Sequence, residues 1–235
     1  MYLRTLLARA TDLLYPPRCA GCGRFGTFFC QPCRDICTPA MGQGRCKRCS
    51  AEWDGADNCP RCFDVQAFES VAAAFEMAGP ARRAVHRLKY ARVRATAPEM
   101  ADDLRRAVAG LTLDYAAPVP LHRSRERERG FNQAAELLAP LGYTPLPGNL
   151  RRRVKTAQQV GRTMRERRRN IADAFAYDGP ELEGATVLLV DDVVTTGATV
   201  DACARVLKDH GASKVYVGAF ARASYKPGSE APIED

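Results

Sequence analysis

Long apolar runs are missing from this 235-residue chain, and so is a signal-peptide pattern. No apolar stretch approaches the roughly 20 residues that a helix needs to span a bilayer. Near the N-terminus, Arg9 interrupts the apolar residues and Pro16-Pro17 follows, which does not match a secretory leader. We therefore expect no transmembrane segment and a cytoplasmic protein. Leucines at mostly helical spacing in residues 2–14 predict a short helix that packs on its own protein, with peripheral contact at the inner face of the membrane as the alternative.

Aliphatic residues are scarce between residues 19 and 62, where cysteines are frequent instead. Eight of the ten cysteines form four C-x-x-C pairs, which are Cys19/Cys22, Cys30/Cys33, Cys46/Cys49 and Cys59/Cys62. Each pair places two thiolates at the spacing that tetrahedral Zn²⁺ requires, so four pairs predict two structural Cys₄ sites. Disulfides are disfavoured without a secretory signal. We expect neighbouring pairs to join in order, because this closes short loops; a cross-braced arrangement is the alternative.

Positive charge is concentrated in the middle of the chain. The formal net charge is +8, but residues 81–169 alone hold 21 Lys and Arg against 8 Asp and Glu. Such a basic region indicates phosphate-rich ligands or nucleic acid, and the alternative is a solvated basic face without a partner. Aromatic residues near the arginines are sparse, so the prediction of nucleic-acid binding rests mainly on charge.

The stretch Val187–Thr199, which reads V-L-L-V-D-D-V-V-T-T-G-A-T, organises the rest of the chain. Its four leading aliphatic residues, without polar alternation, predict a strand that is covered on both faces, as in a parallel sheet. After the turn, Val200, Ala204 and Leu207 share one helical stripe, and Gly211 is a natural helix stop. We therefore expect a strand, an acidic loop and a helix, and ligands of open α/β sheets bind at such junctions.

The turn of this unit predicts a phosphate site. Backbone N–H groups and hydroxyls at a helix N-terminus favour an anion, and the residues that would supply them are Thr195, Thr196, Gly197, Ala198 and Thr199. Asp191 and Asp192 would repel a phosphate and instead suit vicinal sugar hydroxyls or a Mg²⁺ bridged by water. A phosphate beside a diol describes a ribose 5-phosphate. The alternative is an ordinary strand–turn–helix junction with Thr199 as the N-cap.

This stretch resembles the motif with which type I phosphoribosyltransferases bind 5-phosphoribosyl 1-pyrophosphate (PRPP). The resemblance implies that PRPP is the ligand and that Mg²⁺ accompanies it. It also implies that Val193 contributes to the PRPP site, and that Asp191 and Asp192 are the candidate catalytic residues.

Flanking segments predict the rest of an α/β domain. Strands are expected at 71–76, 115–120, 175–177 and 214–220, and helices at 81–90, 97–108, 132–138 and 200–210. In the first of these helices Ala84, Val85 and Leu88 face inward, while Arg87 and Lys89 face outward. Residues 123–133 have no hydrophobic period and are expected to form a loop.

Two arginine clusters carry the basic charge. The first follows a predicted strand and is therefore expected at the ligand edge, where His122, Arg123 and Arg129 are candidates for pyrophosphate. Candidates for single-stranded DNA come from both clusters and are Arg125, Arg127, Arg129, Arg162, Arg165 and Arg169. Because Glu126 and Glu128 alternate with the first arginines, a self-neutralising solvated loop is the alternative.

Three features in order resemble the ComF family: the cysteine pairs, the segment V-P-L-H-R-S-R-E-R-E-R-G-F-N-Q, and V-D-D-V-V-T-T-G-A-T. The resemblance implies a double zinc ribbon in residues 1–66, a type I phosphoribosyltransferase-like, mostly parallel sheet flanked by helices in 67–225, and a tail in 226–235. It also implies a role in natural transformation, where related proteins handle incoming single-stranded DNA beside a helicase-like partner.

Two classes of function fit this sequence. In the first, the protein is a transferase in which a nucleophile replaces pyrophosphate on PRPP. In the second, it is a binding module that keeps the ribose-phosphate pocket while its basic surface holds DNA. No residue of the sequence identifies an acceptor, so both classes stay open.

Overall fold

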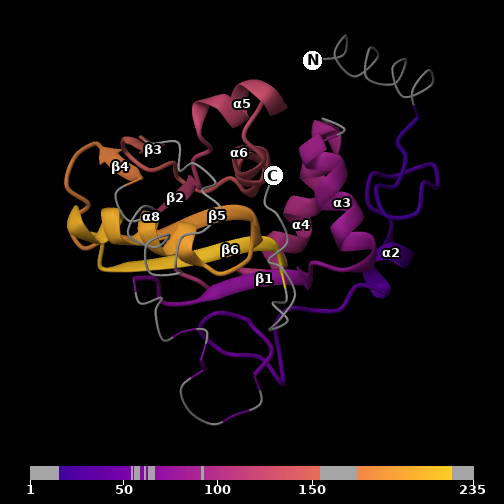
Figure 1. Ribbon diagram of the computed structural model, residues 1–235, viewed down its shortest axis with the longest axis horizontal. Helices are drawn as coiled ribbons and strands as arrows, with labels where there is room; N and C mark the ends of the chain where they lie inside the picture. The colour runs from indigo at the N-terminus through magenta and orange to yellow at the C-terminus, as the bar shows by residue number, and fades with distance from the viewer. Residues whose placement is uncertain are drawn as a thin grey trace, which may run out of the picture.

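The computed structural model describes residues 16–53, 55, 59–60, 62, 67–90, 93–153 and 174–223. Its centre is a parallel sheet with the strand order β1-β6-β5-β2, formed by β1 (Val71–Glu76), β6 (Lys214–Arg222), β5 (Thr186–Val194) and β2 (Tyr115–Pro118). Figure 1 shows these strands running side by side through the middle of the molecule. The central strands β5 and β6 are apolar over most of their length and are covered on both faces, as parallel strands usually are. The mostly parallel sheet is confirmed.

Helices cover the two faces of the sheet. On one face lie α3 (Gly79–Tyr90), α4 (Ala97–Ala107) and α6 (Gln133–Leu138), and on the other lies α8 (Ala198–Asp209). Short elements connect them, namely α2 (Gln31–Asp35), η1 (Arg94–Thr96), α5 (Arg123–Arg129) and η2 (Ala139–Leu141). Among the described residues, no helix is both long and apolar enough to cross a membrane.

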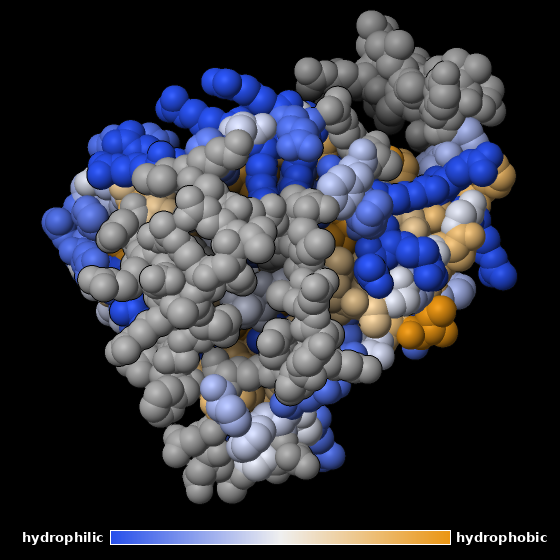
Figure 2. Space-filling view, in the orientation of Figure 1, coloured by the Kyte–Doolittle hydropathy of each residue, from blue (hydrophilic) through white to orange (hydrophobic). Residues whose placement is uncertain are grey.

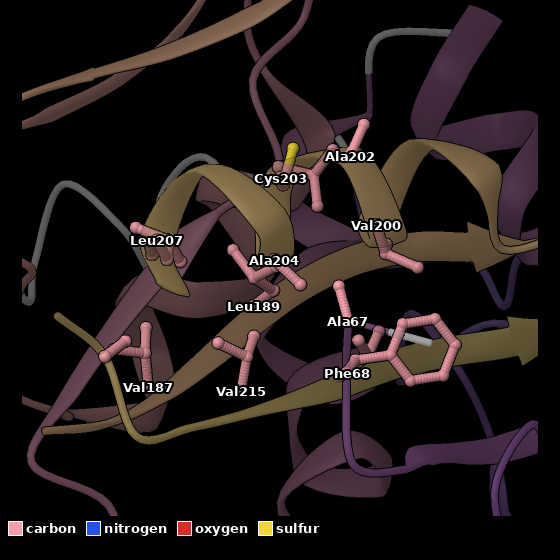
Figure 3. Close-up of a cluster of buried hydrophobic side chains, with 14 of the residues drawn as sticks. Ala67, Phe68, Val187, Leu189, Val200, Ala202, Cys203, Ala204, Leu207 and Val215 are labelled. Carbon is pink, nitrogen blue, oxygen red and sulfur yellow. The ribbon is translucent and has the colours of Figure 1, made fainter. Parts of the chain in front are cut away.

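The core beneath α8 confirms the apolar stripe that the sequence predicts. Val200, Ala204 and Leu207 are buried against the sheet residues Val187 and Leu189 (Figure 3). The helix ends before Gly211, whose φ of 88° lies in the left-handed region that favours glycine. Because β5 and α8 are fixed against each other by this packing, the turn between them has a defined position.

The short strand predicted at 175–177 exists, but it does not join the main sheet. β4 (Phe175–Asp178) pairs antiparallel with β3 (Asn149–Arg152), and the two form a separate two-stranded sheet. Phe175 and Tyr177 are buried in the core beneath α8, while the arginines of β3 face outward or are half-buried. The second arginine cluster therefore begins on a strand.

The prediction of a loop at 123–133 is wrong, because Arg123–Arg129 form the helix α5. His122 caps this helix, its Nδ1 accepting from the Ser124 N–H at 3.2 Å, and Gly130 ends it with a φ of 83°. The buried side of α5 is supplied by Arg129, which is 7% exposed, instead of by an aliphatic residue. A search for apolar periodicity cannot detect a helix whose inward residue is charged.

The first half of the cysteine-rich segment is attached to α4 by polar contacts. The Glu99 carboxylate accepts from Thr27 Oγ1 at 2.6 Å, from Phe28 N at 2.8 Å and from Phe29 N at 2.5 Å. One turn further along α4, the Asp103 carboxylate accepts from the Arg34 guanidinium. Burial raises the pKa of Asp103 in spite of this cation. One carboxylate on α4 thus holds three donors of the first ribbon.

Replacing Glu99 tests this attachment. We expect Glu99→Gln to lower the free energy of unfolding by about 2 kcal/mol, because an amide offers one acceptor oxygen and turns its NH₂ toward donors. The measurement is urea denaturation of the metal-loaded protein followed by circular dichroism. The matched control is Asp102→Asn on the exposed side of α4, which we expect to change stability by less than about 0.5 kcal/mol. Equal effects of the two changes would contradict the attachment.

Candidate functional site

A pocket that is open to solvent lies at the carboxyl ends of β2 and β5. Its lining combines both predicted acids with part of the turn and several cations: Lys89, Val119, Pro120, Leu121, Arg125, Arg129, Arg152, Asp191, Asp192, Val193, Val194, Thr195, Gly197, Thr199 and Val200. This is the edge where open parallel sheets bind ligands. The residues come from distant parts of the sequence, so the fold assembles a site of mixed charge.

The two acids lie within strand β5, so the acidic loop of the sequence prediction is wrong. Asp191 pairs with Ala219 of β6, and the pairing continues to Val194 opposite Arg222. The strand continues because β6 runs equally far and offers backbone partners beyond Val190, as far as Arg222. Asp191 Oδ1 accepts from the Asp192 N–H at 2.8 Å, which helps to fix the orientation of that carboxylate.

Lys89 is a site residue that the sequence prediction missed. It was expected to face outward, but its side chain is 17% exposed, and its Nζ lies 3.1 Å from Asp192 Oδ2, itself 9% exposed. Helical periodicity predicts that Leu88 faces inward and that its neighbour Lys89 faces outward. The acid that Lys89 contacts, Asp192, lies about a hundred positions further along the chain. No local signal predicts that pair. The ion pair offsets the charge of Asp192 in a poorly solvated position.

The turn after β5 has the geometry of an anion site. Gly197 is the N-cap of the twelve-residue helix α8 and adopts a φ of 84°, which L-residues rarely take. Thr195, Gly197 and Thr199 line the pocket, while Thr196 is exposed and its Oγ1 accepts from the Ala198 N–H at 3.3 Å. Gly197 is the N-cap, and Thr199, the cap in the alternative interpretation, lies inside the helix. The positive end of the α8 dipole adjoins the pocket.

Three of the four arginines of α5 line one of two pockets. Arg125 and Arg129 line the first, and Arg129 is held by Gln133 Oε1 at 3.2 Å with its guanidinium over the Tyr90 ring. His122 and Arg123 line an adjoining open pocket, together with Arg151, Arg152 and Arg153. The structure thus separates Arg129 from the other two residues predicted for pyrophosphate.

The remaining candidates for DNA have different positions. Arg127 is exposed on α5 and lines neither pocket. Arg162, Arg165 and Arg169 lie outside the described residues. In Figure 2, hydrophilic side chains gather over the part of the surface where Figure 1 shows α5. Pro120, Leu121 and Arg152 line both pockets, so the two hollows are neighbours across a shared wall.

The cysteine pairs form two compact clusters in sequential order, as predicted. One cluster holds Cys19, Cys22, Cys30 and Cys33, the other Cys46, Cys49, Cys59 and Cys62, and within each the ligand atoms lie within 4.8 Å of one another. The closest sulfur pairs are separated by 3.5–3.8 Å, which matches the roughly 3.8 Å edge of a ZnS₄ tetrahedron with 2.3 Å bonds. All ten cysteines are free of disulfides. The two clusters support structural zinc.

Backbone groups favour the thiolate form of Cys19 in the first cluster. Burial raises the pKa of the Cys19 thiol, but N–H groups of Cys30, Cys22 and Gly21 outweigh it and lower the pKa to about 6. The Gly21 N–H lies 3.3 Å from the Cys19 sulfur. Such N–H donors hold a metal-ligating sulfur in place. Cys37, the thiol beside the first cluster, is buried and donates to the Cys33 carbonyl at 3.1 Å, which agrees with its lack of a pair.

Comparison with known proteins agrees with this division. The profile of the Double zinc ribbon domain matches residues 10–63, and that of the Phosphoribosyl transferase domain matches residues 131–235. Fold and clusters therefore define a protein with a double zinc ribbon and a phosphoribosyltransferase-like sheet.

Three relatives identify the family. Competence protein F of Haemophilus influenzae is 30% identical over 218 residues, which cover 88% of this chain and 85% of that protein. DNA utilization protein YhgH of Escherichia coli O157:H7 is 33% identical over 70% of this chain and 77% of its own length. Competence protein ComFC of Bacillus subtilis is 37% identical over 40% of this chain and 38% of its own length. The chain belongs to the ComF family.

Metal analysis of cysteine variants tests the two clusters. We expect two zinc ions per chain in the wild type and one in each of Cys22→Ser and Cys62→Ser, because three thiolates do not complete a structural site. Cys22 is exposed and Cys62 half-buried, so neither change leaves a large cavity. Cys203→Ser, in the core beneath α8, controls for loss of a buried thiol and should keep two ions. A wild type with a single ion would contradict the assignment.

Proposed function

We propose that the chain binds PRPP in the first pocket and acts in competence or DNA utilisation, holding single-stranded DNA on its basic surface. The observation that carries the proposal is the meeting of Asp191 and Asp192 with the N-terminus of α8 and with four cations in one hollow. A ligand with a diol and several phosphates suits this mixture, because acids accept from hydroxyls while cations balance phosphate charge.

The contacts of the pocket suggest how PRPP lies in it. The 5-phosphate adjoins the turn that contains Gly197, at the positive end of α8. Since Lys89 already offsets the charge of Asp192, we assign the ribose diol first to Asp191. The pyrophosphate lies toward Arg125 and Arg129, which can bind phosphate oxygens in pairs. Mg²⁺, for which the two carboxylates are suitable oxygen ligands, would balance pyrophosphate charge when bound.

The corresponding reaction is substitution at the anomeric carbon. The bond from this carbon to the pyrophosphate oxygen breaks and its electron pair leaves with pyrophosphate. A nucleophile of the acceptor forms the new bond and loses its proton. Arg125 and Arg129 stabilise the departing charge, and the carboxylates hold the sugar as it becomes cationic. The relatives named for competence and DNA utilisation suggest that the acceptor, or the neighbouring ligand, is DNA.

The second candidate function is a binding module without turnover. It is favoured by the exposed and half-buried arginines of the second pocket, which come from β3, from the residue after it and from the start of α5. Such a surface holds the phosphates of a strand without sequence preference. Release of pyrophosphate from PRPP, measured with and without single-stranded DNA, separates the two functions. Turnover favours the transferase, and binding without turnover favours the module.

Calorimetry of the pocket acids tests the PRPP proposal. We expect wild-type protein to bind PRPP with Mg²⁺, and Asp191→Ala and Asp192→Ala to weaken binding below detection. A loss of at least tenfold corresponds to about 1.4 kcal/mol. Asp192→Ala also removes the ion pair between Lys89 and Asp192. The control is Asp209→Ala, an exposed acid at the other end of α8. A wild type that does not bind PRPP would overturn the pocket assignment.

Salt dependence tests the DNA proposal. We expect binding of a single-stranded oligonucleotide to weaken steeply with salt, and the double variant Arg123→Gln/Arg127→Gln to lower the slope of log K against log salt by about 1–2. Both residues are exposed on α5. The control for net charge is Lys214→Gln, which changes an exposed residue at the amino end of β6, the end of the strand away from the pocket. An affinity that does not respond to salt would count against a charge-driven site.

A further inference from the structure

Arg222 lies between the second cysteine cluster and the ligand pocket. It is the last residue of β6 and is only 2% exposed. Its Nε donates to the Cys49 carbonyl at 2.8 Å. On the other side, its Nη1 donates to the Val194 carbonyl at 2.9 Å and to the Thr195 carbonyl. One planar, buried cation thus holds backbone groups of two different sites.

The groups that Arg222 joins both belong to functional parts of the molecule. Cys49 is a member of the second Cys₄ cluster, with its sulfur 3.8 Å from that of Cys59. Val194 and Thr195 line the first pocket and lead directly to the Gly197 turn. One connection between the metal cluster and the pocket therefore runs from the Cys49 carbonyl through the Arg222 side chain to the carbonyls of Val194 and Thr195.

Other contacts hold the same cysteine knuckle against the sheet, but they end at β1 and the segment before it. The Val71 N–H donates to the Arg48 carbonyl at 2.6 Å, and Ser50 Oγ donates to the Val71 carbonyl at 2.7 Å. The Arg48 guanidinium donates to the Phe68 carbonyl at 3.1 Å. Arg222 differs from these in reaching across the sheet edge to the pocket loop. A guanidinium can serve both sides at once because its donors lie in a rigid fork.

We propose that Arg222 is a positioning residue that couples zinc in the second Cys₄ cluster to the conformation of the ligand loop, residues 194–197. Bound metal fixes the knuckle that contains Cys49, whose carbonyl fixes the guanidinium plane. That plane in turn holds the Val194 and Thr195 carbonyls. Without the metal the loop gains freedom, and ligand binding must then order it. Only the identity of the ligand rests on the function proposed above.

The coupling is measured first without any ligand, by hydrogen–deuterium exchange of the full-length protein. We expect the amides of residues 194–200 to exchange about tenfold faster in Cys62→Ser, which lacks the second zinc, than in wild type. Cys22→Ser, which lacks the first zinc, is the matched control and should leave this exchange unchanged. Equal exchange in all three proteins overturns the proposal, and so does equal acceleration in both variants.

Variants of Arg222 provide the second measurement. The ammonium group of a lysine cannot reach both the Cys49 carbonyl and the carbonyls of Val194 and Thr195. Arg222→Lys should therefore accelerate hydrogen exchange in the loop and weaken PRPP binding about tenfold, while both zinc ions remain bound. Arg48→Gln removes a comparable link between the second ribbon and the sheet without touching the loop, and should leave PRPP binding within about twofold. If Arg48→Gln has the same effect as Arg222→Lys, general loosening of the ribbon explains both, and the specific role of Arg222 is wrong.

Reciprocity supplies the last measurement. Because coupling acts in both directions, PRPP with Mg²⁺ should slow the release of the second zinc to a colorimetric chelator about tenfold, and not that of the first. This difference should disappear in Arg222→Lys. If wild-type protein binds no PRPP, the proposed function fails, yet loop exchange in the cysteine variants still decides the coupling. If PRPP binds and zinc release is unaffected, the coupling fails and the function stands.

Discussion

The parallel pairing of β5 with β6 is the constraint on which the rest of the structure depends. It sets Asp191 opposite Ala219 and Val194 opposite Arg222. Because parallel strands end at the same edge, the acids, the Gly197 turn and the buried arginine meet there. Apolar packing on both faces holds this register, and a slip by one residue would turn every side chain of β5 to the other face. The same packing that forms the core therefore sets the geometry of the pocket.

The zinc-ribbon segment also forms backbone hydrogen bonds with the main sheet. The Pro39 segment forms a bridge to Phe75, the Ala40 N–H donates to the Ala74 carbonyl at 3.2 Å, and the Glu76 N–H donates to the Thr38 carbonyl at 2.8 Å. These bonds cover the outer edge of β1, which would otherwise present unpaired backbone groups. Metal clusters allow a segment poor in aliphatic residues to hold a fixed shape there. The ribbons are thus part of the support of the sheet that carries the pocket.

The sequence predicted those features that depend on local pattern. The stripe of α8, the buried runs of β5 and β6, and the sequential cysteine clusters all have signals in neighbouring residues. It failed where polar tertiary contacts decide. Arg129 makes α5 a helix whose buried side is charged, and Lys89 finds its acid on a distant strand. Arg222 is hidden for the same reason, since its partners are backbone carbonyls that carry no sequence signature.

The two function classes share the first pocket and differ in what occupies the second. Arg152 and the Pro120–Leu121 wall line both hollows, so a molecule in the second pocket would lie next to PRPP in the first. The lining of the second pocket contains one acid, Glu126, and four arginines, which are Arg123, Arg151, Arg152 and Arg153. Such an excess of cations favours a phosphate-bearing neighbour over a neutral base, because a cluster of positive side chains attracts phosphate groups. The proposed DNA strand satisfies that requirement whether it accepts a phosphoribosyl group or is only held.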